Sequence, residues 1–130
     1  MSRCVLLGAA LAAALSVPCI VQAQHVVQRS FPQNALRGEI VVVAPPEITL
    51  NGRAARLAPG SRIRGQNNML VMSGSIVGAK LVVNYTVDDL GLVKDVWVLR
   101  EDEARKTWPK TREEAARWAF DPAAQVWVKR

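Results

Sequence analysis

Short apolar runs, each closed by turn-forming residues, fill the sequence from residue 37 to residue 100. The runs are rich in β-branched side chains, and the residues that separate them include Pro45-Pro46, Asn51-Gly52, Pro59-Gly60 and Asp88-Asp89-Leu90-Gly91. Strands of this kind, with turn signals about every eight to twelve residues, predict a small sandwich or barrel. We therefore expect a mainly β fold, a small antiparallel barrel of the OB-like or SH3-like kind with five to seven short strands.

The dipeptide Asn51-Gly52 is the clearest turn signal, because both residues tolerate the positive φ angles of a type I′ turn. It predicts a hairpin between a strand at residues 47–50 and a return strand at residues 53–57. Pro59-Gly60 predicts a second turn, after which residues 61–65 are expected to form a separate short strand.

Residues 79–87 alternate between apolar and polar side chains, which predicts a strand with one buried face. The apolar face would carry Leu81, Val83, Tyr85 and Val87, and the other face Lys80, Asn84 and Thr86. The turn at residues 88–91 leads into residues 92–100, which we expect to pair with this strand in antiparallel fashion.

The chain changes character after residue 100. Residues 101–106 are highly charged, and Trp108-Pro109 interrupts any helix. Thr111 with Glu114 three residues later forms a capping box, which predicts a helix over residues 112–120 that packs against the barrel. A last edge strand is expected at residues 125–129.

The first 23 residues have the three parts of a secretory signal peptide: positive Arg3, an apolar run at residues 4–17, and small side chains up to Ala23. Cleavage is therefore expected after Ala23, in a periplasmic or secreted protein. The apolar run is shorter than the roughly 20 residues of a membrane span. A lipoprotein with Cys19 as the lipidated residue is an alternative, although the residues before Cys19 lack the usual pattern.

These features divide the chain into four parts. A signal peptide at residues 1–23 precedes an extended, weakly ordered segment at residues 24–36. The barrel core is expected at residues 37–100, and the helix and tail that pack on it at residues 101–130.

Both cysteines, Cys4 and Cys19, lie in the leader. The mature chain therefore has no disulfide, no thiolate nucleophile and no cysteine metal ligand. Its stability must come from an apolar core, which a single domain of this length can build. No long apolar run follows the leader, so we expect no transmembrane span in the mature chain.

The positive charge is concentrated in the first half of the mature chain. The net charge is +6 for the whole sequence and falls to +5 when Arg3 leaves with the leader. Residues 29–65 hold six arginines against Glu39 and Glu47. A basic surface attracts anionic molecules in general, so the expected partner is an anionic component or a protein of the cell envelope.

Four arginines of this stretch are candidate ligand-binding residues: Arg53, Arg56, Arg62 and Arg64. On a strand, Arg62 and Arg64 share one face while Ile63 lies on the other. Such a row of guanidinium groups could hold a carboxylate, phosphate or sulfated sugar. The alternative is a solvated strand edge whose charges prevent aggregation.

Three tryptophans recur in the tail, namely Trp108, Trp118 and Trp127. Exposed together, their indoles could form a platform for a carbohydrate or a peptide. The alternative, which we favour, is that they clamp the tail onto the open end of the barrel.

We expect no catalytic residue, no cofactor and no metal site. The single histidine, His25, lies beside the cleavage site. Met69 and Met72 fall on opposite faces of a strand, and Asp88-Asp89 fits a turn. Nucleic acid is not an expected partner, because the arginines and the aromatic residues occupy different segments and the chain is exported.

The segments LNGRAARLAPGSRIR and GLVKDVWVL carry a resemblance to a family of small, uncharacterised exported bacterial proteins. That resemblance implies export and a β-rich domain. The order of strand, LNG turn, strand and PG turn is also similar to small secreted OB-like barrels.

We therefore expect a non-catalytic binding or accessory module of the cell envelope that engages its partner through the arginine-rich hairpins. One alternative is a structural or assembly subunit that pairs through an exposed strand edge. A carboxylate-dependent hydrolase, using acids such as Asp88, Asp95 and Glu101, ranks third.

Overall fold

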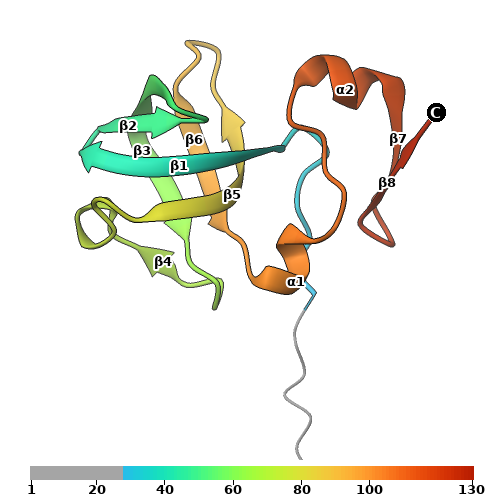
Figure 1. The fold of residues 1–130 in the computed structure, drawn as a ribbon, viewed down its shortest axis with the longest axis horizontal. Helices are drawn as coiled ribbons and strands as arrows, with labels where there is room; N and C mark the ends of the chain where they lie inside the picture. Colours follow the sequence, from blue (N-terminus) through green and yellow to red (C-terminus); the bar gives the residue numbers. More distant parts are fainter. Residues whose placement is uncertain (1–27) are drawn as a thin grey trace, which may run out of the picture.

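The computed structural model describes residues 28–130, so the predicted leader, with Cys19 and Ala23, and also His25 lie outside the described residues. The described chain is mainly β, with only short helices (Figure 1). Its elements are, in chain order, β1 (Leu36–Ala44), β2 (Glu47–Leu50), β3 (Arg53–Arg64), β4 (Leu70–Val71), η1 (Ser73–Ser75), β5 (Lys80–Val87), β6 (Val93–Val98), α1 (Glu101–Ala104), α2 (Arg112–Arg117), β7 (Trp118–Asp121) and β8 (Val126–Lys129).

Six strands form one sheet in the order β2-β1-β5-β6-β3-β4, and β2 also pairs with β3. The hydrogen bonding therefore closes a ring of five strands, with β4 added outside it on β3. The prediction of a purely antiparallel sheet was wrong, because β3 and β6 run parallel. A closed ring with an odd number of strands cannot alternate in direction all the way round, so one neighbouring pair must be parallel.

The predicted hairpin at Asn51-Gly52 is confirmed. Asn51 has a φ of 54° and Gly52 a φ of 82°, and Leu50 lies opposite Arg53 in the antiparallel β2/β3 pair. Positive φ at both central residues is what a type I′ turn requires. The antiparallel pairing of β5 with β6 is confirmed as well.

The prediction of a turn at Pro59-Gly60 was wrong, because β3 continues through it from Arg53 to Arg64. Leu57 lies opposite Val93 of β6, whereas Arg62 lies opposite Asp95, so the register shifts between them. Gly60, with a φ of 77°, adopts a conformation that other residues avoid. An irregularity of this kind bends a strand: β2 pairs with the first half of β3 and β4 with its second half, while β6 pairs with β3 on both sides of the irregularity.

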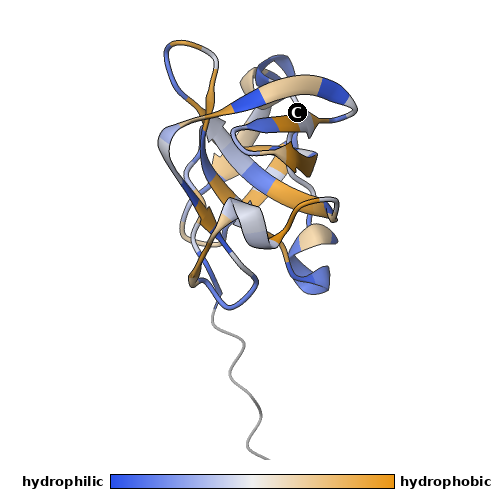
Figure 2. Ribbon diagram, turned by 90° about the vertical axis from the view of Figure 1, so that its left-hand side faces the viewer, coloured by the Kyte–Doolittle hydropathy of each residue, from blue (hydrophilic) through white to orange (hydrophobic). Residues whose placement is uncertain are grey.

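The inside of the ring is an apolar core. Its buried side chains are Leu36, Ile40, Val42, Ile48, Leu57, Ile63, Val83, Tyr85, Val93, Val96 and Val98. Apolar and polar positions follow one another along the strands (Figure 2). Gly38 lets Tyr85 pack closely, because a Cβ at residue 38 would lie 2.8 Å from the Tyr85 ring.

The face of β5 that the sequence marks as polar is also buried in part. Asn84 has 0% of its surface exposed, and its side-chain oxygen accepts a 2.8 Å hydrogen bond from Arg37 of β1. Arg37 in turn donates to the carbonyls of Ala104 and Lys106, which follow β6 in the chain. The segment after β6 therefore covers this side of the ring.

A second apolar cluster lies outside the ring, between the ring and the C-terminal tail. Its buried members are Phe31, Ala35, Leu99, Trp108 and Trp127, and half-buried Trp97, Trp118 and Phe120 pack against it. The antiparallel hairpin of β7 and β8 supplies much of it.

The predicted C-terminal helix exists but is shorter than expected. Thr111 caps it by accepting a hydrogen bond from the backbone N–H of Glu114, and it ends at Arg117. Trp118 has extended dihedral angles and begins β7. The pairing of residues 118–121 with β8 overrides their helical pattern, because the hairpin brings Phe120 against Trp127.

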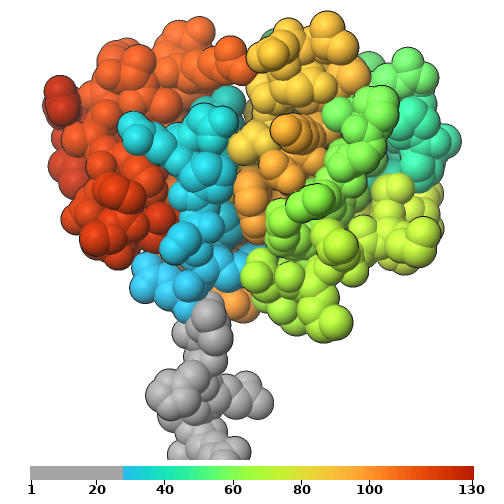
Figure 3. Space-filling model, turned by 180° about the vertical axis from the view of Figure 1, so that it is seen from behind, coloured from blue at the N-terminus to red at the C-terminus, as the bar shows by residue number. Residues whose placement is uncertain are grey.

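The segment before β1 runs between the ring and the tail (Figure 3). Phe31 and Ala35 are buried in the second cluster, and the backbone N–H of Phe31 donates to the side chain of Gln125. The sequence predicts a weakly ordered segment at residues 24–36. Its described part contributes Phe31 and Ala35 to the second apolar cluster.

Candidate functional site

The four arginines that the sequence indicates all lie on β3. Arg53, Arg56 and Arg62 are exposed, and Arg64 is half-buried. Ile63 points into the ring, so Arg62 and Arg64 lie on the outer side of the strand. The structure therefore brings these residues onto one continuous strand rather than two, and β3 crosses the surface of the molecule (Figure 3).

The arginines differ in how strongly they are held. The Arg56 guanidinium lies 3.6 Å from the Glu47 carboxylate, with both side chains largely exposed. Arg64 lies 3.8 Å from Asp95 and stands over the ring of Trp97, with 5.7 Å between the guanidinium carbon and the ring centroid. Arg53 and Arg62 form no ion pair with any residue between 28 and 130. Arg53 and Arg62 are therefore the more available cations.

The sequence around these arginines lacks opposing charge. Residues 48–87 contain no aspartate and no glutamate. The carboxylates that do reach β3 come from neighbouring strands, Glu47 from β2 and Asp95 from β6. The outer side of β3 is therefore positively charged overall.

The tail tryptophans do not share one exposed surface. Trp108 and Trp127 are buried, with 5.7 Å between their ring centroids in an edge-on contact. The Trp108 indole N–H also donates a 2.8 Å hydrogen bond to the carbonyl of Ala35. Trp118 is half-buried, and the Lys129 ammonium lies 5.2 Å from its ring centroid. The two buried indoles thus join the tail to the segment before β1.

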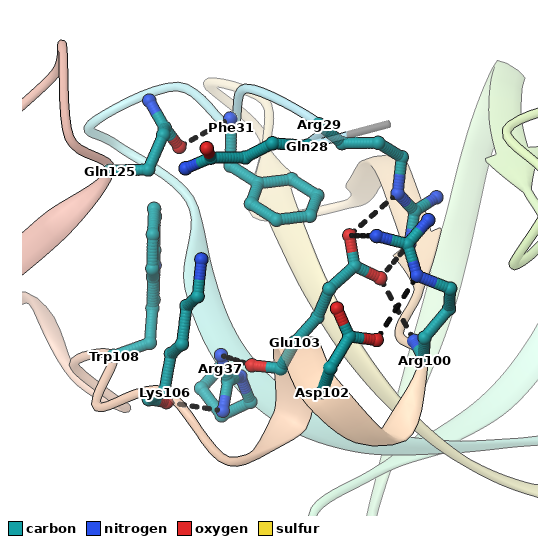
Figure 4. A pocket seen from close by; sticks show the side chains of 10 residues that line it. All are labelled: Gln28, Arg29, Phe31, Arg37, Arg100, Asp102, Glu103, Lys106, Trp108 and Gln125. Carbon is teal, nitrogen blue, oxygen red and sulfur yellow. Dashed lines mark hydrogen bonds and ion pairs between the residues drawn. The ribbon is translucent and has the colours of Figure 1, made fainter. Parts of the chain in front are cut away.

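A buried charged cluster, not indicated by the sequence, lies near Trp108 (Figure 4). Arg29 donates two hydrogen bonds to the carboxylate of Glu103 and one each to the carbonyls of Gly65 and Val98. It therefore ties the segment before β1 to β6, to α1 and to the turn after β3. Four of its five N–H groups have partners, so this arginine holds the fold rather than awaiting a ligand.

Glu103 is the anionic centre of the cluster. Burial alone would raise the pKa of its carboxyl group, but the hydrogen bonds from Arg29 and from the Arg100 backbone, with the charges of both arginines, outweigh burial and leave the pKa below its usual value. Glu103 is buried, whereas Glu101 and Asp102 of the same charged run are exposed. The third carboxylate of the run turns inward because α1 begins at Glu101 and its third residue forms the capping box.

Arg37 is the second buried cation. Its guanidinium bonds Asn84 and the backbone carbonyls of Glu103, Ala104 and Lys106. Burial lowers the pKa of Arg37, and the negative charge of Glu103 opposes that effect. Like Arg29, it has four of its five N–H groups engaged, so it connects β1 to the end of α1.

These groups surround a pocket of about 260 Å³ between the ring and the tail. Its lining residues are Gln28, Arg29, Phe31, Arg37, Arg100, Asp102, Glu103, Lys106, Trp108 and Gln125. Between residues 28 and 130 no three histidines, cysteines or carboxylates come together as metal ligands would. Within the same residues no helix has the length and apolar character needed to cross a membrane.

The chain matched no protein-family model, no curated protein and no solved structure. The candidate site therefore rests on its own geometry, in which the exposed arginines of β3 and the buried cluster around Glu103 have separate roles. The sequence indicated the exposed arginines, because the alternation of side chains along a strand can be read from neighbouring residues. The sequence did not indicate the buried cluster around Glu103. A signal that could have pointed to it is the arginine at residue 37, which stands directly before an apolar run.

Proposed function

We propose that this chain is a non-catalytic binding or accessory module of the bacterial cell envelope that holds an anionic partner through β3. The observation that carries the proposal is the placement of four arginines on one continuous strand, with Arg53 and Arg62 exposed and outside the ion pairs of the described chain. Guanidinium groups bind carboxylate, phosphate and sulfate groups through paired hydrogen bonds.

The strand order of the ring supports an OB-like barrel. β1 lies between β2 and β5, and β3 lies between β2 and β6, which closes five strands in a Greek-key order. OB folds bind extended ligands on the face formed by their second and third strands. In this chain those are β2 and β3, so the arginines lie on the strand that such folds use.

Export follows from the signal-peptide pattern of residues 1–23, with cleavage after Ala23. The resemblance to small exported bacterial proteins points the same way. We place the protein in the periplasm or outside the cell.

The test is retention on a heparin resin. The double variant Arg53→Gln/Arg62→Gln removes the two available cations, and we expect it to elute at clearly lower salt than the parent. The matched control is Arg105→Gln/Arg117→Gln, which removes the same charge from exposed positions of the tail. Equal elution of the two double variants would contradict the proposal.

The second candidate, a subunit that pairs through a strand edge, is favoured by β4. This strand has only two residues, pairs with β3 alone, and leaves its outer edge without a strand partner among residues 28–130. It predicts a complex in envelope extracts that high salt does not dissociate. A monomer that purifies without a partner would contradict it.

We do not propose the hydrolase. Asp88 accepts hydrogen bonds from the backbone N–H groups of Leu90 and Leu92 and so holds a turn. Asp95 lies near Arg64, and Glu101 pairs with Arg105 on the surface. Asp88 and Asp95 line one shallow hollow, which Glu101 does not reach, and each of these acids has a structural role.

A further inference from the structure

An apolar groove adjoins the arginine row at the edge of the sheet. The β3 residues Ser61, Arg62 and Ile63 line one side, and the residues from Leu70 to Ser75 line the other. Arg62 thus belongs both to the cationic side of β3 and to the wall of this groove.

Large apolar side chains are exposed in the groove, at Leu70 and Met72, and next to it in the chain, at Met69. Met69 is 66% exposed, Leu70 is 69% exposed and Met72 is 81% exposed. These three lie within four consecutive residues, at a two-residue edge strand and its flanks. Contiguous apolar side chains at a surface mark a contact with a protein or a membrane.

The charged residue in the lining of the groove is the cation Arg62, whose register partner on β6 is Asp95. Arg62 borders the groove, and no carboxylate occurs in the sequence between residues 48 and 87. Exposed apolar tips beside a cation match a membrane with anionic lipids, because the apolar side chains enter the acyl region while the cation lies at the headgroups. Aromatic side chains, which anchor most protein interfaces, do not line this groove.

The start of the described chain lies at the same end of the molecule. Arg29 donates a hydrogen bond to the carbonyl of Gly65, four residues before Met69. The first described residues and the turn after β3 lie side by side at this end (Figures 1 and 3). The first described residues therefore lie beside the turn that leads into β4.

We infer that the edge formed by Met69, Leu70, Met72 and Arg62 docks on an anionic lipid surface. The inference rests on the proposed function and names the partner of the same arginine row. The apolar tips insert at the interface, and Arg62 contacts the phosphate groups of the lipids.

The experiment measures binding of the protein, expressed from the full sequence, to sedimented vesicles. One set of vesicles contains phosphatidylglycerol in phosphatidylcholine, and the other contains phosphatidylcholine alone. We expect binding to the first set only. Arg62→Gln should weaken it about fivefold, and Leu70→Ser/Met72→Ser about tenfold or more.

The matched control is Leu90→Ser/Val128→Ser, which removes two exposed apolar side chains far from the groove in the sequence. It should bind as the parent does, and thermal melts should show that all variants remain folded. If the control lost as much vesicle binding as Leu70→Ser/Met72→Ser, the inference would be overturned. Binding would then depend on exposed apolar side chains in general rather than on those at the groove. Binding that depends on Arg62 alone would also overturn it.

Heparin retention separates the two proposals. Arginine-dependent retention on heparin without binding to anionic vesicles overturns the lipid inference and leaves the proposed function standing. If neither arginine-dependent retention on heparin nor binding to anionic vesicles is found, the proposed function and the lipid inference are both overturned.

Discussion

Arg29 and Glu103, 74 residues apart in the chain, form a buried ion pair with two hydrogen bonds. Arg29 also bonds carbonyls at the end of β3 and the end of β6, so three segments meet at one guanidinium group. Because the pair joins the segment before β1 to α1, it keeps the tail against the ring.

Replacing Glu103 with Gln should leave the Arg29 charge buried without a counterion. We expect the free energy of unfolding to fall by about 3–5 kcal/mol, the usual effect of removing one partner of a buried pair. Urea denaturation followed by tryptophan fluorescence measures it. Glu101→Gln is the matched control on the same short helix, where the exposed pair with Arg105 contributes about 1 kcal/mol or less. Similar losses in both variants would show that burial of the pair is not important.

The same carboxyl group predicts how stability depends on pH. Its pKa in the folded protein is lowered from the usual value of 4.5, so folding favours the ionised form. The stabilisation is complete above the unfolded pKa and is lost as the pH falls through the lower, folded value. The urea midpoint of the parent should therefore drop below about pH 4.5. The urea midpoint of Glu103→Gln should fall less than that of the parent over the same pH range. If both midpoints fall equally, the pH dependence does not come from the Glu103 carboxyl group.

Gly38 should tolerate no side chain. An added Cβ would lie 2.8 Å from the Tyr85 ring and 3.2 Å from Leu50, and the buried ring cannot move away. Gly38→Ala should therefore cost about 1–3 kcal/mol of stability through overpacking. Gly74→Ala is the control, since nothing lies within 4 Å of its added Cβ. Thermal melts of both variants check the difference.

The two buried indoles should respond differently to the same substitution. Trp108 donates its N–H to the Ala35 carbonyl, whereas the N–H of Trp127 has no hydrogen-bond partner among residues 28–130. Phe at either position removes similar volume, but only Trp108→Phe leaves a carbonyl without its donor. We expect Trp108→Phe to destabilise by about 1–3 kcal/mol more than Trp127→Phe. Chemical denaturation of the two variants gives the comparison, and a larger loss in Trp127→Phe would contradict it.

Features encoded within a few residues were predictable. Asn51-Gly52 forms a hairpin because positive φ at two adjacent residues is a local property. The same holds for the cap that Thr111 provides to Glu114. In the candidate site, the shared outer side of Arg62 and Arg64 followed from strand alternation alone.

Other features depended on distant partners. Pro59-Gly60 has the composition of a turn, yet it lies within one continuous strand, because β6 pairs with β3 on both sides of it. Trp118 continues a helical pattern, yet it begins a strand, because β8 pairs with it. The contact of Arg64 with Asp95 and Trp97 likewise needed the parallel pairing of β3 with β6.

By itself the sequence determined a mainly β chain, the hairpin turn at Asn51-Gly52 and the shared outer side of Arg62 and Arg64, since each depends on backbone preferences and spacing over a few residues. The tertiary structure alone decided that Arg29, Arg37 and Glu103 are buried together. A charged side chain enters the interior only when its partner and several carbonyl groups arrive at the same place. That condition depends on how segments far apart in the chain pack, which local sequence patterns do not contain.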